Sequence, residues 1–120
     1  MKNIKDDIFN ALSRVFDNVS DQYPKVVWAD FPTLQYTEEE NKVFEHTDEG
    51  ETKSYVRYRI DIWHNRSTSE AALQVDEILS AFGLVRTLCQ DAPDPSGMKH
   101  KVMRYEAIID MENDYIYWPD

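Results

Sequence analysis

The chain has 120 residues, with 13 Lys and Arg side chains against 23 Asp and Glu side chains, which gives a formal net charge of −10 at pH 7. A length of 120 residues is typical of a single domain, and the 42% apolar content excludes a disordered chain, because it supplies enough apolar area to offset the loss of chain entropy. The negative charge argues against capture of nucleic acid or of an anionic membrane as the main task. A single cysteine, Cys89, excludes an intramolecular disulfide framework and a cysteine-based zinc site.

Targeting segments are not predicted. The lysines near the N-terminus have no apolar run behind them, as a signal peptide would have. No stretch approaches the roughly 18 uninterrupted apolar residues of a transmembrane helix. We therefore expect a soluble, intracellular, acidic domain.

The first predicted element is an amphipathic helix over residues 4–19, since apolar residues recur there at spacings of three and four. Asp6 and Asp7 fall in its first turn, where the helix dipole favours negative charge. Pro24 disfavours helical geometry at Tyr23, so the helix is expected to end between residues 19 and 22. A short extended run over residues 25–29 follows.

A long hairpin is predicted next. Its first arm covers residues 33–46, its turn residues 47–51, and its second arm residues 55–63; Gly50 can adopt the positive φ that the turn needs. In the second arm, apolar residues alternate with polar and aromatic ones, which is typical of a strand with one buried face. The buried set is Val56, Tyr58, Ile60 and Ile62.

The second half begins with a helix after residue 67. Ser67 and Glu70 match a capping box, and Gly83 is placed where a glycine ends a helix. Strands over residues 84–90 and 100–111 and an aromatic tail over residues 113–120 complete the chain. The expected fold is α+β, in the order α-β-β-β-α-β-β, with a mainly antiparallel sheet, two helices on one face and a projecting hairpin. We expect one domain, residues 1–120.

A catalytic or metal site is not predicted. The three histidines, His46, His64 and His100, have no metal-ligand spacing, and three glycines are too few for a glycine-rich phosphate loop. No catalytic, cofactor-binding or metal-binding residues are therefore assigned, and no enzyme activity is expected.

Charge is unevenly distributed along the chain. Residues 38–51 contain seven acidic side chains against Lys42, a net charge of −6, whereas residues 52–66 have a net charge of +3. Two explanations of this charge pattern are open. Opposite charges can pair across the hairpin and protect its edge from aggregation, or the molecule can associate head-to-tail with copies of itself, a kind of contact that closes into rings.

The aromatic tail also has two interpretations. Tyr115, Tyr117 and Trp118 can fold back over the sheet, which is the commoner arrangement, or they can form an arm that docks on a neighbouring molecule, because Tyr and Trp are favoured at interfaces.

Taken together, this layout resembles the small tail terminator or tail-completion proteins, also called head–tail joining or minor capsid proteins, of Firmicutes phages and prophages. The resemblance covers nearly the full length. It depends on the opening helix, Tyr23-Pro24, residues 28–36, the strand over residues 55–63, the helix after Ser67, and three further segments. These segments are Phe82-Gly83-Leu84, residues 94–97, and Arg104-Tyr105.

The resemblance implies a structural protein of the virion, made in the host bacterial cytoplasm and placed at the tail–neck junction. Such proteins assemble as a ring, usually a hexamer, that caps the tail tube, ends its growth and offers a surface to the neck or head connector. The implied partners are further copies of the chain, the tube, the sheath where there is one, and the neck protein. No cofactor, metal or membrane is implied, and DNA at most passes through the channel.

Interface residues are predicted from charge and placement. We expect the acidic hairpin to contact the neighbouring subunit or to face the channel, with arginines as partners. The predicted residues are Glu38, Glu39, Glu40, Glu45, Asp48, Glu49, Glu51, Arg57, Arg59 and Arg104. The alternative function is an acidic DNA mimic that inhibits a host nuclease or DNA-binding protein. The net-basic segments argue against it, because a mimic needs an unbroken acidic face.

Overall fold

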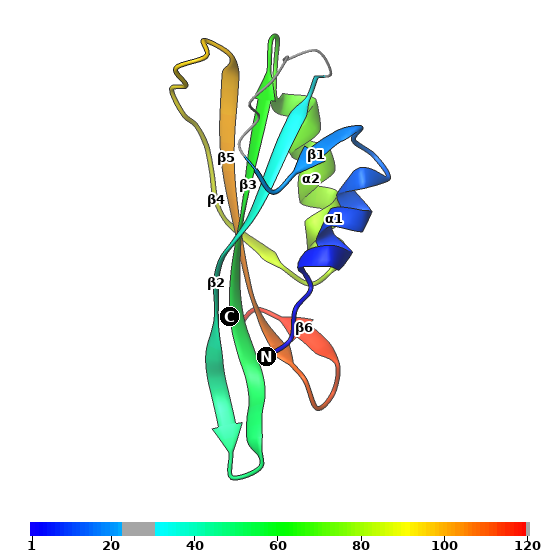
Figure 1. Ribbon diagram of the computed structural model, residues 1–120, viewed down its shortest axis with the longest axis vertical. Coiled ribbons are helices and arrows are strands. Elements are labelled where there is room, and N and C mark those ends of the chain that lie inside the picture. The colour runs from blue at the N-terminus through cyan, green and yellow to red at the C-terminus, as the bar shows by residue number, and fades with distance from the viewer. Residues whose placement is uncertain (23–30, 120) are drawn as a thin grey trace.

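The computed structural model of the chain describes residues 1–22 and 31–119. Within them, two helices and six strands follow one another along the chain (Figure 1). They are α1 (Lys5–Ser13), β1 (Asn18–Ser20), β2 (Thr33–Thr47), β3 (Gly50–His64), α2 (Ser69–Ala81), β4 (Val85–Asp91), β5 (Lys99–Asp110) and β6 (Tyr115–Tyr117). The predicted α+β class and the predicted order of elements are confirmed, while the extended run predicted over residues 25–29 lies outside the described residues.

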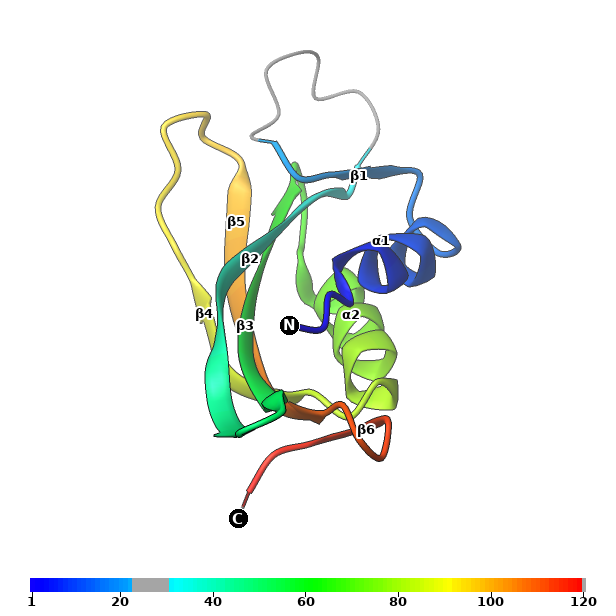
Figure 2. The same cartoon turned by 60° about the horizontal axis from the view of Figure 1, so that its bottom comes forward.

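One mixed sheet forms the centre of the molecule. Its strand order is β1-β2-β3-β5-β4, with β6 paired to β5, and the pairs are antiparallel except β1 with β2. Both helices cover the same face of this sheet, as predicted (Figures 1 and 2). Neither of them is long and apolar enough to cross a membrane.

The core lies between the helices and the inward face of β3 and β5. Val56, Tyr58, Ile60 and Ile62 of β3 are fully buried, which confirms the predicted alternation. They face a second buried row on β5 that includes Met103, the register partner of Ile60. The helices supply Ile8 and Leu12 from α1 and Val75 and Leu79 from α2.

The outward face of β3 differs from its prediction near the end of the strand. Asp61 and Trp63 lie on the face that was expected to be open, yet both are buried. The reason is tertiary, because the loop that joins β4 to β5 places Asp94 against Trp63.

The hairpin of β2 and β3 is the longest feature of the molecule, which measures 51 Å along its longest axis and 27 and 25 Å across. Its far half continues past α1 and α2 (Figure 1). Asp48 and Glu49 form a two-residue turn between the paired Thr47 and Gly50, and Gly50 has φ of 123°. The predicted projecting hairpin and its glycine turn are therefore present.

The first helix is shorter than predicted. It ends at Ser13 and not between residues 19 and 22. Asn18, Val19 and Ser20 instead pair with Thr33–Gln35 of β2 as a parallel strand. Pairing with the sheet satisfies both the backbone groups of this segment and the apolar side chain of Val19, so tertiary contacts override the helical periodicity.

The predicted capping box at α2 is wrong. The helix begins at Ser69 with Thr68 as its N-cap, so Glu70 is the second helical residue and cannot reach back as a third one would. The Ser67 hydroxyl accepts a hydrogen bond from the Ser69 amide at 3.2 Å, so one amide of the first turn has a side-chain partner, whereas the side chain of the N-cap Thr68 makes no capping hydrogen bond.

The C-terminal end of α2 follows the prediction. Gly83 has φ of 95°, and its amide donates to the Ser80 carbonyl at 3.0 Å. A Cβ atom at this position would clash with the carbonyl oxygen of Ile116 in β6. A glycine is thus required both by its φ and by the close approach of the C-terminal strand.

We predict that Gly83→Ala destabilises the protein more than Gly97→Ala. Both glycines have positive φ, but a Cβ at Gly97 meets no atom within 4 Å. The Gly97 variant should lose about 1–2 kcal/mol from backbone conformation alone, and the Gly83 variant at least about 1 kcal/mol more, because β6 must shift. Denaturant unfolding of both variants measures this difference, and equal losses would contradict the packing of β6 against Gly83.

Candidate functional site

The sheet face opposite the helices presents two clusters of paired charges. The first is centred on Glu39 of β2, whose carboxylate contacts Arg57 of β3 and Arg104 of β5. Its Oε1 accepts hydrogen bonds from Arg57 Nε at 3.2 Å and Arg104 Nε at 2.9 Å, and its Oε2 accepts one from Arg104 Nη2 at 3.3 Å. One carboxylate thus joins β2, β3 and β5 across the outer face.

The electrostatics of Glu39 follow from this geometry. Burial by itself raises the pKa of the carboxyl group, but the hydrogen bonds and positive charges of Arg104 and Arg57 outweigh burial, so the pKa is lowered. The ionised form of Glu39 is therefore the one that the fold stabilises.

The second cluster lies at the end of the sheet farthest from the hairpin turn. Arg59 donates to Asp61 from Nε at 2.9 Å and from Nη2 at 3.0 Å, and His100 Nε2 lies 2.8 Å from the same carboxylate. The His100 ring stacks on the Trp63 ring, with centroids 4.6 Å apart. Trp63 Nε1 donates to Asp94 Oδ1 at 3.0 Å, which fixes the β4–β5 loop on the sheet.

This second cluster is not among the sites predicted from the sequence. His100, Asp61 and Asp94 are separated along the chain and match no motif. A signal was present in the strand patterns, since Trp63 and Asp61 share one face of β3, but the partner strand and its register were needed to place His100 beside them. His100 is buried, and its Nδ1 atom has no hydrogen-bond partner among the described residues.

Most of the predicted interface acids are engaged within their own chain. Tyr58 donates to Glu38 at 2.6 Å, and burial together with this carboxylate raises the pKa of Tyr58. Glu40 lies 3.6 Å from Arg57, and Glu45 lies 3.7 Å from Lys53. Glu51 forms an ion pair with the N-terminal amine. Pairing of opposite charges across the hairpin, the first of the two explanations for the charge pattern, is thus observed at Glu39, Glu40 and Glu45.

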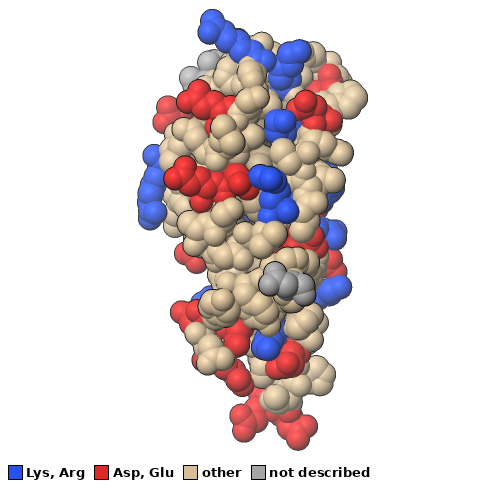
Figure 3. Space-filling model, turned by 180° about the vertical axis from the view of Figure 1, so that it is seen from behind, with Lys and Arg blue, Asp and Glu red and all other residues tan. Residues whose placement is uncertain are grey.

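The tip of the hairpin is different. Neither Asp48 nor Glu49 forms an ion pair with any residue in the described ranges, and both are exposed. In Figure 3, acidic side chains gather at this tip, at the bottom of the view, and basic side chains project from the opposite end of the molecule. Asp48 and Glu49 are therefore the predicted acids that are available to a partner.

The C-terminal residues fold back on the same chain. Tyr115–Tyr117 forms β6, with Ile116 opposite Ile109 of β5. Ile116 packs against the core, and the Trp118 ring lies 6.0 Å from the Tyr55 ring, measured between centroids. The structure thus has the folded-back arrangement for Tyr115, Tyr117 and Trp118, of which Tyr115 is the most exposed.

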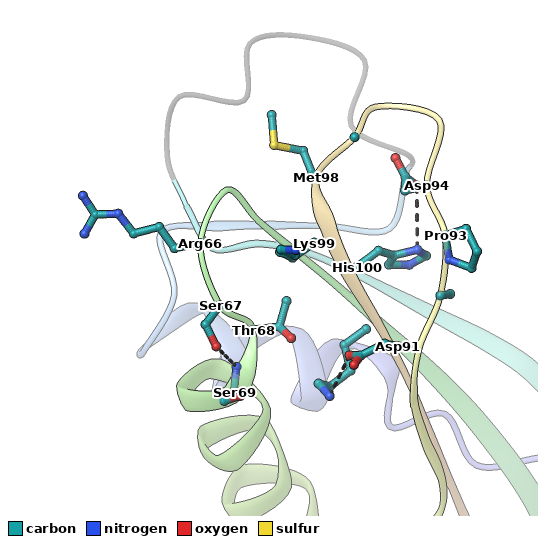
Figure 4. Close-up of a pocket in the computed structure, with 13 residues that line it drawn as sticks. Arg66, Ser67, Thr68, Ser69, Asp91, Pro93, Asp94, Met98, Lys99 and His100 are labelled. Carbon is teal, nitrogen blue, oxygen red and sulfur yellow. Dashed lines mark hydrogen bonds and ion pairs between the residues drawn. The ribbon is translucent and has the colours of Figure 1, made fainter.

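A polar groove lies at the N-terminus of α2, at the end of the molecule opposite the hairpin tip (Figure 4). It has a volume of about 680 Å³. The residues before and within the first turn of α2 line one side of it, and residues 91–101 line the other. The charged lining residues are Arg66, Asp91, Asp94, Lys99 and Lys101.

Both carboxylates of this groove already have partners. Asp91 pairs with Lys101 at 2.9 Å, and Asp94 accepts hydrogen bonds from Trp63 and from the Ser96 amide. Burial raises the pKa of Asp94, but the hydrogen bonds from Ser96 and Trp63 outweigh burial, and the pKa is lowered. Among the described residues, Arg66 and Lys99 have no ion-pair partner, so the groove keeps two uncompensated cations.

In the described ranges, no group of three or more His, Cys, Asp or Glu side chains is placed so that it could hold a metal ion. The sequence matches no protein-family model and no curated protein.

We predict that Glu39→Gln lowers the free energy of unfolding by about 1 kcal/mol at neutral pH, because Arg57 and Arg104 lose a charged partner. The pKa of Glu39 is lowered in the folded state. Its stabilisation is therefore fully present above its unfolded pKa of about 4.3 and is lost as the pH falls through the lower folded value.

Unfolding by denaturant across this pH range measures the difference between wild type and variant. Glu49→Gln, at the exposed tip, is the matched control and should change stability little at any pH. A difference for Glu39→Gln that stays constant down to the lowest pH would contradict the role of its charge.

Proposed function

We propose that the protein is a structural subunit of the phage tail terminator type, which assembles with copies of itself into a ring at the end of a tail tube. The observation that carries this proposal is the hairpin of β2 and β3, whose far half extends past the helices (Figure 1). The resemblance of the whole sequence layout to tail terminator proteins supports the same proposal.

The surface of the projecting half combines exposed apolar side chains with two acids, Asp48 and Glu49, that form an ion pair with no described residue. Val43 and Phe44 are 54% and 52% exposed. Phe44 also lines a shallow groove of about 330 Å³ together with Tyr55, Ile108 and Trp118. Aromatic side chains that border a groove are typical anchors of protein interfaces.

The ion pairs and hydrogen bonds within the subunit change which of the predicted residues we assign to the contact with a neighbouring subunit. Glu38, Glu39 and Glu40 hold the hairpin together through Tyr58, Arg57 and Arg104, so their reversal would damage the subunit itself. We therefore assign the subunit contact to Phe44 and to the tip residues Asp48 and Glu49.

The proposed partners are further copies of the chain, six in a ring as in tail terminator proteins, together with the tail tube and the neck or head-connector protein. The proposed location is the tail–neck junction of the virion. An acidic hairpin that faced the channel would repel DNA and let it pass without binding.

The alternative function, an acidic DNA mimic, has less support. Arg57, Arg59 and Arg104 lie among the carboxylates of the outer sheet face. A mimic of the DNA backbone needs an unbroken row of negative charge, which these arginines interrupt.

We predict that the purified protein forms rings on the ends of tail tubes and stops their growth, as seen by electron microscopy and by the distribution of tube lengths. Phe44→Asp should abolish the rings, because it places a charge in the subunit contact. Leu73→Asp is the matched control, since Leu73 is 73% exposed on α2, away from the hairpin.

Tubes that grow to the same length with and without the wild-type protein would contradict the proposal. Capture of a nuclease from host lysate that competing DNA prevents would instead favour the DNA mimic.

A further inference from the structure

The two ends of β3 carry opposite charges that form no ion pair with any described residue. At one end, the two-residue turn presents Asp48 and Glu49. At the other end, the chain continues from His64 to Arg66 and the α2 groove, and Lys99 lies opposite His64 in the register. The length of a 15-residue strand separates these ends. The tip therefore cannot reach the groove of its own molecule, but it can reach that of another.

The groove has the chemistry that binds a carboxylate. The first turn of α2, where the Ser69 amide already donates to Ser67, contributes its further amide donors and the positive end of the helix dipole. Ser67, Thr68 and Ser69 line the groove with hydroxyl groups, and Arg66 extends outward at its rim (Figure 4). These are the groups that bind anions at helix N-termini.

A buried histidine also lines this groove. His100 is 91% buried, since 9% of its surface is exposed. Its Nδ1 atom has no hydrogen-bond partner in the described part of the chain and faces Asp94 Oδ1 at 3.7 Å, the pair joined by a dashed line in Figure 4. The part of the groove that is open to an incoming carboxylate is therefore the side of Arg66, Lys99 and the first turn of α2.

The hairpin tip is shaped to enter such a groove. Its turn has only two residues, so both carboxylates project from the apex, and the Thr47 hydroxyl accepts a hydrogen bond from the Glu49 amide at 3.3 Å. The groove volume of about 680 Å³ is within the range of about 300–1,000 Å³ that is usual for ligand sites.

We propose that the tip of one molecule, Asp48 and Glu49, docks in the α2 groove of a second copy, where Arg66, Lys99 and the first turn of α2 bind its carboxylates. The contact joins two different surfaces of the same chain, so each bound copy leaves one tip and one groove free for the next. Contacts of this kind close into rings when the rotation permits. This inference rests on the proposed self-assembling function and names the surfaces that perform it.

The test uses charge reversal at each surface. Asp48→Lys with Glu49→Lys makes the tip basic, and Arg66→Glu with Lys99→Glu makes the groove acidic. Either double variant alone should associate at least about tenfold more weakly than wild type, because like charges then face each other. An equal mixture of the two should regain association, since each basic tip meets an acidic groove and each acidic tip meets a basic groove.

Sedimentation velocity over a range of concentrations measures the association, and circular dichroism checks that each variant is folded. Asp48→Asn with Glu49→Gln gives a second tip variant that removes charge without reversing it. Asp17→Lys with Glu77→Lys is the matched control, because it changes the net charge equally at exposed positions outside both surfaces. The control should associate like the wild type.

Salt dependence gives an independent readout. Association should weaken as the salt concentration rises from about 0.01 M to about 1 M, over which the Debye length falls from about 30 Å to about 3 Å. A wild-type protein that stays monomeric up to about 1 mM, or a mixture that does not regain association, would overturn the proposal. Binding of inorganic phosphate in the groove without self-association would also overturn it.

The outcomes separate this contact from the proposed function. If the tip and groove variants still cap tail tubes as the wild type does, the contact is wrong and the function stands. If reversal and mixing behave as expected but wild-type protein leaves tube growth unchanged, the contact stands and the function is wrong.

Discussion

The pairing of β3 with β2 on one side and β5 on the other is the interaction on which the rest of the structure depends. The ladder to β2 runs from Trp63 opposite Thr33 to Gly50 opposite Thr47, and the ladder to β5 from His64 to Lys53. It fixes which side chains face the helices, and it brings Tyr58 opposite Tyr105 inside the core. Burial of such large side chains contributes about 1.5–3 kcal/mol each.

The same ladder determines the charge pattern of the outer face. Since β2, β3 and β5 lie side by side, Glu39 meets Arg57 and Arg104, although 65 residues separate Glu39 from Arg104. It also keeps the tip and the α2 groove at opposite ends of the molecule. An acidic chain of net charge −10 would repel its own copies if the charge were uniform. At one end acids, and at the other end cations, have no ion-pair partner among the described residues, and this arrangement permits attraction between copies.

The fold was largely predictable because its elements have strong local patterns. The alternation in β3 and the glycine at residue 83 each point to one local conformation, and the structure has both. The prediction for α1 was wrong because tertiary contacts decided its end, and the prediction of the capping box was wrong because of where α2 begins. Val19 fits the stripe of a helix as well as it fits a strand, and only β2 selects the strand. A shift of one residue in the start of α2 removes Glu70 from the position that a capping box requires.

By itself, the sequence determined the α+β class, the long hairpin with its acidic turn and the segregation of charge, because these depend on residue periods and positions along the chain. Only the tertiary structure decided which charges remain available. Glu38, Glu39 and Glu40 look alike in the sequence as a row of acids, but register gives them partners, whereas Asp48 and Glu49 at the apex have no described ion-pair partner. The physical reason is that a charge is neutralised by neighbours in space, and strand register brings together residues that are far apart in the chain.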